Sequence, residues 1–116
     1  MEHAGMTVQE LESGVTLIAL RGRLDLQGVS AIEPKFTATA GSRSSLVVDL
    51  SGVAYIASMG LRMLLLVGKT VAARHGKIAL LAPSDDLSTV LRTAGVDTAI
   101  PIHANQREAL SSVGKA

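Results

Sequence analysis

A short apolar run near the middle of the chain, Leu46 to Leu50, constrains the fold more than any other feature of the sequence. Gly41 and several serines precede it and Ser51-Gly52 follows it, so turn-forming residues bound the run on both sides. A continuous run of this kind indicates a strand that is buried on both faces. Because such strands occur in parallel sheets covered by helices, we expect an α/β fold with this strand at the middle of the sheet.

The segments around this strand supply the other elements that an α/β sheet requires. Ser13-Gly14, a pair typical of tight turns, separates two β-prone stretches and predicts an opening hairpin. Helical spacing of apolar residues and capping residues such as Asn105 predict the helices. The expected strands are 7–12, 15–21, 46–50, 77–82 and 99–103, and the expected helices lie around 29–40, 58–75, 84–94 and 105–113. This order predicts a mixed, mainly parallel sheet of about five strands with four or five covering helices.

A few residues predict where individual helices begin and end. Pro34 fits the first helix only if it lies in that helix's first turn, because proline lacks the N–H that a helix interior uses. Gly76 is expected to stop the long helix that begins at Ser58. Ser84 is expected to cap the next helix and Gly95 to end it.

The long helix is apolar on two sides. At about 100° per residue, the side that we expect to pack on the core comprises Leu61, Leu64, Leu65, Gly68 and Ala72. Met59, Met63 and Leu66 are then expected on the opposite side, among cationic residues. Flexible methionines beside cations are typical of a surface that docks a partner. The alternative is that a neighbouring helix of the same chain covers these residues.

Length and composition exclude several classes of partner. The 116 residues suffice for one hydrophobic core, so we expect one domain over residues 1–116. Phe36 and Tyr55 are the only aromatic residues and the net charge is +1 without a basic stripe, so nucleic acid is not an expected partner. The longest apolar run, Met63 to Val67, is too short to span a bilayer, and cysteine is absent. Both features favour a cytoplasmic protein that does not insert into membranes.

No pattern in the sequence supports catalysis, a cofactor or a metal site. Gly68-Lys69-Thr70 matches the end of a phosphate-binding loop, but Met63 stands where that loop requires its first glycine. The three histidines lack ligand spacing to one another or to acids. Asp85 and Asp86 point about 100° apart on a helix, which fits stabilisation of the helix dipole and not acid–base chemistry. We therefore expect no catalytic residues, no cofactor and no metal, and a protein that is not an enzyme.

The most informative segment runs from Asp49 to Leu61 and joins the central strand to the long helix. Here the chain resembles the STAS domains of anti-sigma factor antagonists, in which a strand ends in Asp-Leu-Ser. In those domains a turn follows, and Asp-Ser-Ser/Thr-Gly-Leu then opens the next helix. The resemblance implies the STAS fold and extends to Gly22–Asp25, Leu91–Val96 and Arg107–Leu110, which together span almost the whole chain.

The same resemblance implies a modification site. In that family the serine two positions before the motif glycine is phosphorylated by an anti-sigma factor with serine kinase activity, and the matching residue here is Ser58. A phosphatase for reactivation is implied as well. A helix start suits Ser58 physically, since unpaired N–H groups there can donate to a capping hydroxyl oxygen or to an anion. The expected partner-binding residues are Asp25, Ala57, Ser58, Met59, Gly60, Arg62, Met63 and Leu66.

Two residues depart from the family's motif. Ala57 stands where an acidic residue usually precedes the serine, which puts recognition by the kinase in question. Met59 stands where a second serine or threonine is usual, which leaves Ser58 as the only acceptor in the motif. Ser51 is a weaker second candidate for phosphorylation.

Two functions from different classes remain open at this point. An anti-sigma factor antagonist binds its kinase, releases a sigma factor and loses the partner on phosphorylation. A STAS accessory subunit of a lipid-transport ABC system, which the departure at Ala57 favours, instead binds the transporter ATPase whether or not it is phosphorylated. A third possibility, a nucleotide-binding module, is not supported, because the sequence contains no phosphate-binding loop. Self-association into a weak homodimer is left open.

Overall fold

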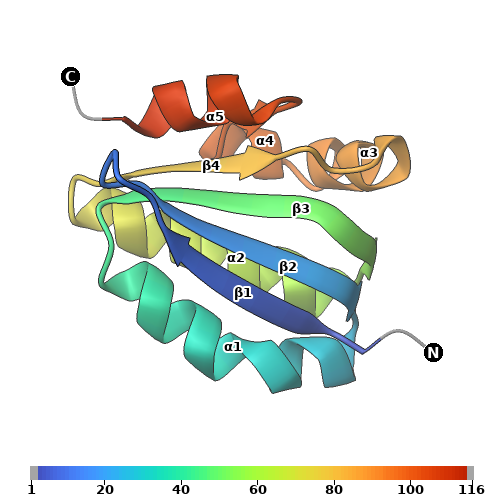
Figure 1. Ribbon diagram of the computed structural model, residues 1–116. Coiled ribbons are helices and arrows are strands. Elements are labelled where there is room, and N and C mark those ends of the chain that lie inside the picture. Colours follow the sequence, from blue (N-terminus) through green and yellow to red (C-terminus); the bar gives the residue numbers. More distant parts are fainter. Residues whose placement is uncertain (1–2, 115–116) are drawn as a thin grey trace.

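Strand β3 (Ser45–Ile56) lies at the centre of the sheet, as the apolar run predicted (Figure 1). The computed structural model describes residues 3–114 and arranges their strands in the order β1-β2-β3-β4-β5. The other elements are β1 (Gly5–Glu10), β2 (Thr16–Leu24), α1 (Leu26–Gly41), α2 (Ser58–Ala73), β4 (Lys77–Leu81), α3 (Asp85–Thr93), α4 (Val96–Ala99), β5 (Ile102–His103) and α5 (Gln106–Val113). Only β1 is antiparallel to its neighbour, so the expected mixed, mainly parallel α/β sheet is confirmed.

Helices cover the two faces of the sheet unequally. The larger core cluster packs α1, α2, α3 and α4 against one face, whereas the smaller cluster packs α5 against the other. In β3, Val48 belongs to the larger cluster and Val47 to the smaller, so the central strand is buried on both faces. Because α5 contacts β3, β4 and β5, no helix among residues 3–114 lies over that face of β1 and of most of β2 (Figure 1).

Strand β3 is longer than the sequence predicted. The pair Ser51-Gly52 was expected to end the strand in a turn, but β3 continues through it to Ile56. An ideal Cβ at Gly52 would lie 3.1 Å from the Cβ of Arg21 and 3.2 Å from the Leu20 carbonyl oxygen. Gly52 therefore permits a close approach of two strands and does not form a turn, and the pairing of β2 with β3 is irregular at this point.

The expectation for Pro34 was also wrong. Pro34 lies in the interior of α1 and not in its first turn. The missing N–H would have bonded to the carbonyl of Ser30, and both residues are exposed, so water can satisfy that carbonyl. The helix tolerates proline here because the interrupted hydrogen bond faces solvent, while Phe36 on the other side is fully buried.

The chain after β4 contains a turn of helix that periodicity did not indicate. Ser84 caps α3 by accepting a hydrogen bond from the N–H of Leu87 at 3.1 Å, as expected. Gly95 ends α3 as predicted, with φ +78°, but it also begins the short helix α4. Residue 99 therefore belongs to α4, and the last strand, predicted over 99–103, is only Ile102–His103.

At the remaining helix ends, the predicted cap of α5 is confirmed and the predicted role of Gly76 at the end of α2 is wrong. Asn105 caps α5 by accepting a hydrogen bond from the N–H of Glu108 at 2.9 Å, as predicted. Helix α2 ends at Ala73, and the residue in the left-handed region is His75, with φ +61°, and not Gly76. No helix within residues 3–114 combines the length and the apolar character needed to cross a membrane.

Candidate functional site

The carboxyl ends of β2 and β3 lie next to each other and place two helix starts together. Leu24 and Ile56 are paired in the parallel register, and the N–H of Ala57 donates to the Leu24 carbonyl oxygen at 2.9 Å. Asp25 and Ala57 directly follow these strands, and each is the N-cap residue of the next helix, α1 or α2. The pairing therefore brings together two segments that lie about thirty residues apart in the sequence.

Asp25, one of the predicted partner-binding residues, has a structural role at this edge. Its carboxylate accepts a hydrogen bond from the N–H of Gly28 at 2.9 Å and lies 3.6 Å from the Nε of Arg23. The Gly28 hydrogen bond, and secondarily the Arg23 charge, hold the pKa of Asp25 below its usual value. The side chain thus fixes the start of α1 beside the start of α2.

Gly60, the glycine of the sequence motif, is buried and serves packing. An ideal Cβ there would lie 2.7 Å from the Cγ1 of Ile56 and 3.1 Å from the Leu24 carbonyl oxygen. The absence of a side chain lets α2 begin directly against the ends of both strands. Gly60 was predicted to contact a partner, but it is buried and lies against Ile56 and Leu24 at the strand ends.

Ser58 is the first residue of α2, and its side chain is exposed. The alternative that its hydroxyl caps the helix does not hold, because Ala57 is the N-cap and no side chain among the described residues caps α2. Within residues 3–114, the Ser58 hydroxyl takes part in no hydrogen bond with another residue. The hydroxyl is consequently available to another molecule.

The outward side of α2 continues from Ser58 as a shallow hollow. It has a volume of about 390 Å³. Its lining residues are Ser58, Leu61, Arg62, Leu65, Leu66 and Lys69. Leu66 is 46% exposed, and Arg62 and Lys69 supply two positive charges beside it. The hollow therefore combines a hydroxyl, two cations and apolar side chains along one helix.

The predicted position of Met63 was wrong. Met63 is fully buried, although the helical wheel placed it on the outward side with Met59 and Leu66. The buried residues of α2 follow ordinary helical spacing, so the core side of α2 is turned relative to the predicted one; they are Gly60, Met63, Leu64, Val67, Gly68 and Val71. The alternative considered above, that Met63 is covered within the same chain, therefore holds, because Met63 belongs to the larger core cluster. Conversely Ala72, expected in the core, is exposed.

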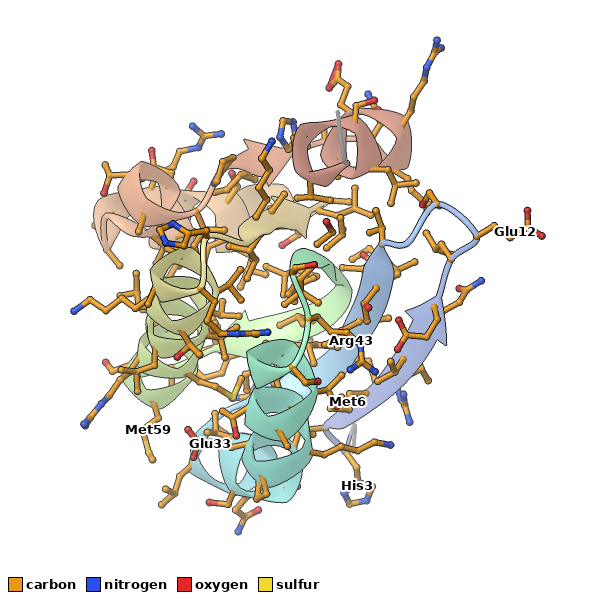
Figure 2. All side chains as sticks on the ribbon, turned by 90° about the vertical axis from the view of Figure 1, so that its left-hand side faces the viewer. His3, Met6, Glu12, Glu33, Arg43 and Met59 are labelled. Atoms are coloured by element: carbon orange, nitrogen blue, oxygen red, sulfur yellow. The ribbon has the colours of Figure 1, made fainter. Side chains whose placement is uncertain are left out.

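Met59 is 44% exposed, and Figure 2 shows its side chain at the start of α2, pointing away from the fold. Two more apolar residues near the strand ends are exposed and were missed in the sequence: Leu26, at 61%, and Tyr55, at 43%. The guanidinium carbon of Arg23 lies 4.4 Å from the centre of the Tyr55 ring. The only sequence signal for the exposure of Leu26 was its position directly after Asp25, the residue at which helix α1 opens.

We name these exposed residues the strand-end surface. It consists of Leu26, Tyr55, Ser58, Met59, Arg62 and Leu66. Of the partner-binding residues predicted from sequence, Ser58, Met59, Arg62 and Leu66 belong to it. Asp25, Ala57 and Gly60 support it from the strand ends, and Met63 lies in the core. In the part of the chain that the structure describes, no group of three or more histidine or acidic residues could hold a metal ion.

A five-stranded, mainly parallel sheet in sequence order with helices on both faces defines an α/β fold. The model of the family described as "Mlab, STAS domain" matches residues 7–103, and the chain belongs to this family.

Individual relatives resemble the chain along nearly its whole length. BtrV of Bordetella bronchiseptica, which carries the provisional name of an anti-sigma factor antagonist, is 29% identical over 112 residues, covering 95% of this chain and 94% of BtrV. The crystal structure of an anti-sigma factor antagonist from Mycobacterium paratuberculosis has a TM-score of 0.85 at 25% identity and covers 95% of this chain and 93% of that one. The phosphorylated form of the Bacillus cell fate determinant SpoIIAA has a TM-score of 0.70 at 21% identity, with 92% and 97% covered.

Proposed function

We propose that this protein is an anti-sigma factor antagonist and that it binds an anti-sigma factor through the strand-end surface. The observation that carries the proposal is the exposed, unbonded hydroxyl of Ser58 within an apolar and cationic surface. The similarity to BtrV over 95% of the chain supports the same function. Exposed apolar side chains such as Leu26 and Met59 supply the contact area that a protein partner requires.

Control of this binding is proposed to occur by phosphorylation of Ser58. A phosphoryl group carries roughly −1.5 to −2 charges at pH 7. Placed next to Met59 on a surface that exposes apolar side chains, it would bring charge and bound water into an apolar contact, which opposes association. The unmodified protein is therefore the binding form, and it releases a sigma factor by occupying the anti-sigma factor.

The proposed partner is an anti-sigma factor with serine kinase activity, and a phosphatase restores the binding form. SpoIIAA, which shares the fold, exists in a phosphorylated form, and this supports the proposal. Ala57 leaves the position before Ser58 without a carboxylate. Recognition by the kinase must then depend on the other exposed residues of the strand-end surface, with Arg62 as its charged member.

Capture experiments from the lysate of the host organism test this proposal. Four tagged baits are used: the native chain, Ser58→Ala, Ser58→Asp and Ser111→Asp. Ser111 is an exposed serine of α5, which packs on the opposite face of the sheet, so its variant controls for added charge alone. We expect the native, Ser58→Ala and Ser111→Asp baits to capture an anti-sigma factor with a kinase domain, identified by mass spectrometry, and Ser58→Asp to lose it.

Two other results would contradict the proposal. Equal capture of the kinase by Ser58→Asp and by the native bait would remove the role of Ser58 in binding. Capture of a transporter ATPase by all four baits would instead make the chain a constitutive subunit of an ABC system, the function left open by the sequence.

A further inference from the structure

Arg62 is the residue best placed to meet a charge on Ser58. The two residues are four positions apart on α2, which puts them on the same side of the helix about 6 Å apart along its axis. Both are exposed and both line the hollow on the outward side of α2. Side chains at this spacing are direct neighbours on a helix surface.

No acidic side chain competes for Arg62 in the described part of the chain. The ion pairs within residues 3–114 join Arg23 to Asp25 and Arg43 to Glu10, and neither involves α2. The first turn of α2 contains no acid, since Ala57 precedes Ser58 and Met59 follows it. Lys69, the other cation at the hollow, is seven residues beyond Arg62, or about 10 Å farther along the axis.

We infer that Arg62 pairs with the phosphoryl group when Ser58 is phosphorylated, and that this pairing is part of the switch. The inference rests on the proposed phosphorylation of Ser58. A guanidinium offers a planar pair of N–H donors that match two phosphoryl oxygens, and the i, i+4 spacing brings that pair within reach. Lysine at the distance of Lys69 offers neither the geometry nor the proximity.

The pairing gives phosphorylation a second effect besides the added charge. In the unmodified protein, Arg62 is the exposed cation of the strand-end surface and is available to an acidic side chain of the partner. In the phosphorylated protein, the guanidinium is held by the phosphoryl group on its own helix. A single modification thus removes both an apolar contact and a cationic contact from the surface.

The test measures the second pKa of the phosphoryl group directly. Phosphoserine is installed at position 58 by genetic encoding, and the free protein is titrated by phosphorus NMR at low salt as the native chain, Arg62→Gln, Arg62→Lys and Lys69→Gln. A neighbouring cation favours the dianion and so lowers this pKa from its ordinary value of about 6. We expect Arg62→Gln to raise it by roughly half a unit, as an exposed ion pair would. Lys69→Gln should leave it near the native value, and Arg62→Lys should fall between.

The start of α2 acts on the phosphoryl group equally in all four proteins, so the differences isolate the side chains. Equal pKa values in the native chain and Arg62→Gln would overturn the inference, as would an equal rise in Lys69→Gln. Because the titration uses the free protein without kinase or partner, it stands apart from the capture experiment. A failed capture with the expected pKa change would reject the proposed function and keep the pairing. A successful capture without the pKa change would keep the proposed function and reject the pairing.

Discussion

At the scale of single residues, the Asp25 carboxylate fixes the start of α1 and is held in its ionised form. Its carboxylate accepts the Gly28 N–H at 2.9 Å, and Gly28 itself must lack a side chain, because an ideal Cβ would lie 1.9 Å from the Arg23 carbonyl oxygen. A cap and a glycine three residues apart therefore fix the end of β2 against the start of α1. This edge is also the support on which Ser58 is presented.

The lowered pKa of Asp25 predicts a dependence of stability on pH. A carboxyl whose pKa is lower in the folded state stabilises the fold above its ordinary value of 3.8. That contribution is lost as the pH falls through the lower folded-state value. We expect the native chain to melt at a higher temperature than Asp25→Asn at pH 7, and the difference to close as the pH falls toward 2. Asparagine keeps the cap, so only the charge changes, and Glu10 titrates equally in both proteins.

A melting-temperature difference between native and Asp25→Asn that stays constant across this pH range would contradict the assignment. It would mean that the hydrogen bond from Gly28 and the charge of Arg23 do not favour the ionised form of Asp25 in the folded protein.

At the scale of elements, the two methionines of α2 that were both predicted to be exposed differ in burial. Met63 is fully buried in the larger core cluster, whereas Met59 is 44% exposed. We expect Met63→Ala to lower the free energy of unfolding by about 2–5 kcal/mol, because it leaves a cavity in the core. Met59→Ala should change it by less than about 0.5 kcal/mol but weaken binding of the anti-sigma factor. Urea unfolding measures the first quantity and calorimetric titration the second.

Equal losses of stability in these two variants would contradict the orientation of α2 described above. A Met59→Ala variant with unchanged stability and unchanged affinity would remove Met59 from the strand-end surface.

The elements also show which parts of the fold can be read from sequence. The run Leu46–Leu50 and the caps Ser84 and Asn105 have local signals, and all three predictions were confirmed. Met63 was misplaced because α2 carries two apolar stripes of similar helical spacing, and the stripe through Leu61 and Leu65 was taken as the core side in place of the buried one through Met63. Gly52 was misread because a glycine that permits strands to approach has the same local sequence as one in a turn.

At the scale of the whole molecule, the site exists only through the pairing of two distant strands. The resemblance at residues 49–61 points to Ser58, which is exposed at the start of α2. Leu26 and Tyr55 could not be added to it from sequence, since their exposure depends on how the helices pack on the sheet. The pairing of these strands brings the starts of α1 and α2 together, and exposed residues on and next to these helices include a hydroxyl, a guanidinium and apolar side chains.

The central claim is that phosphorylation of Ser58 controls binding to an anti-sigma factor. The most direct measurement is the affinity of the captured anti-sigma factor for the chain with and without phosphoserine at position 58, by calorimetric titration of purified proteins. We expect the phosphorylated chain to bind at least about tenfold more weakly, which corresponds to roughly 1.4 kcal/mol. Equal affinities for the two forms would contradict the account.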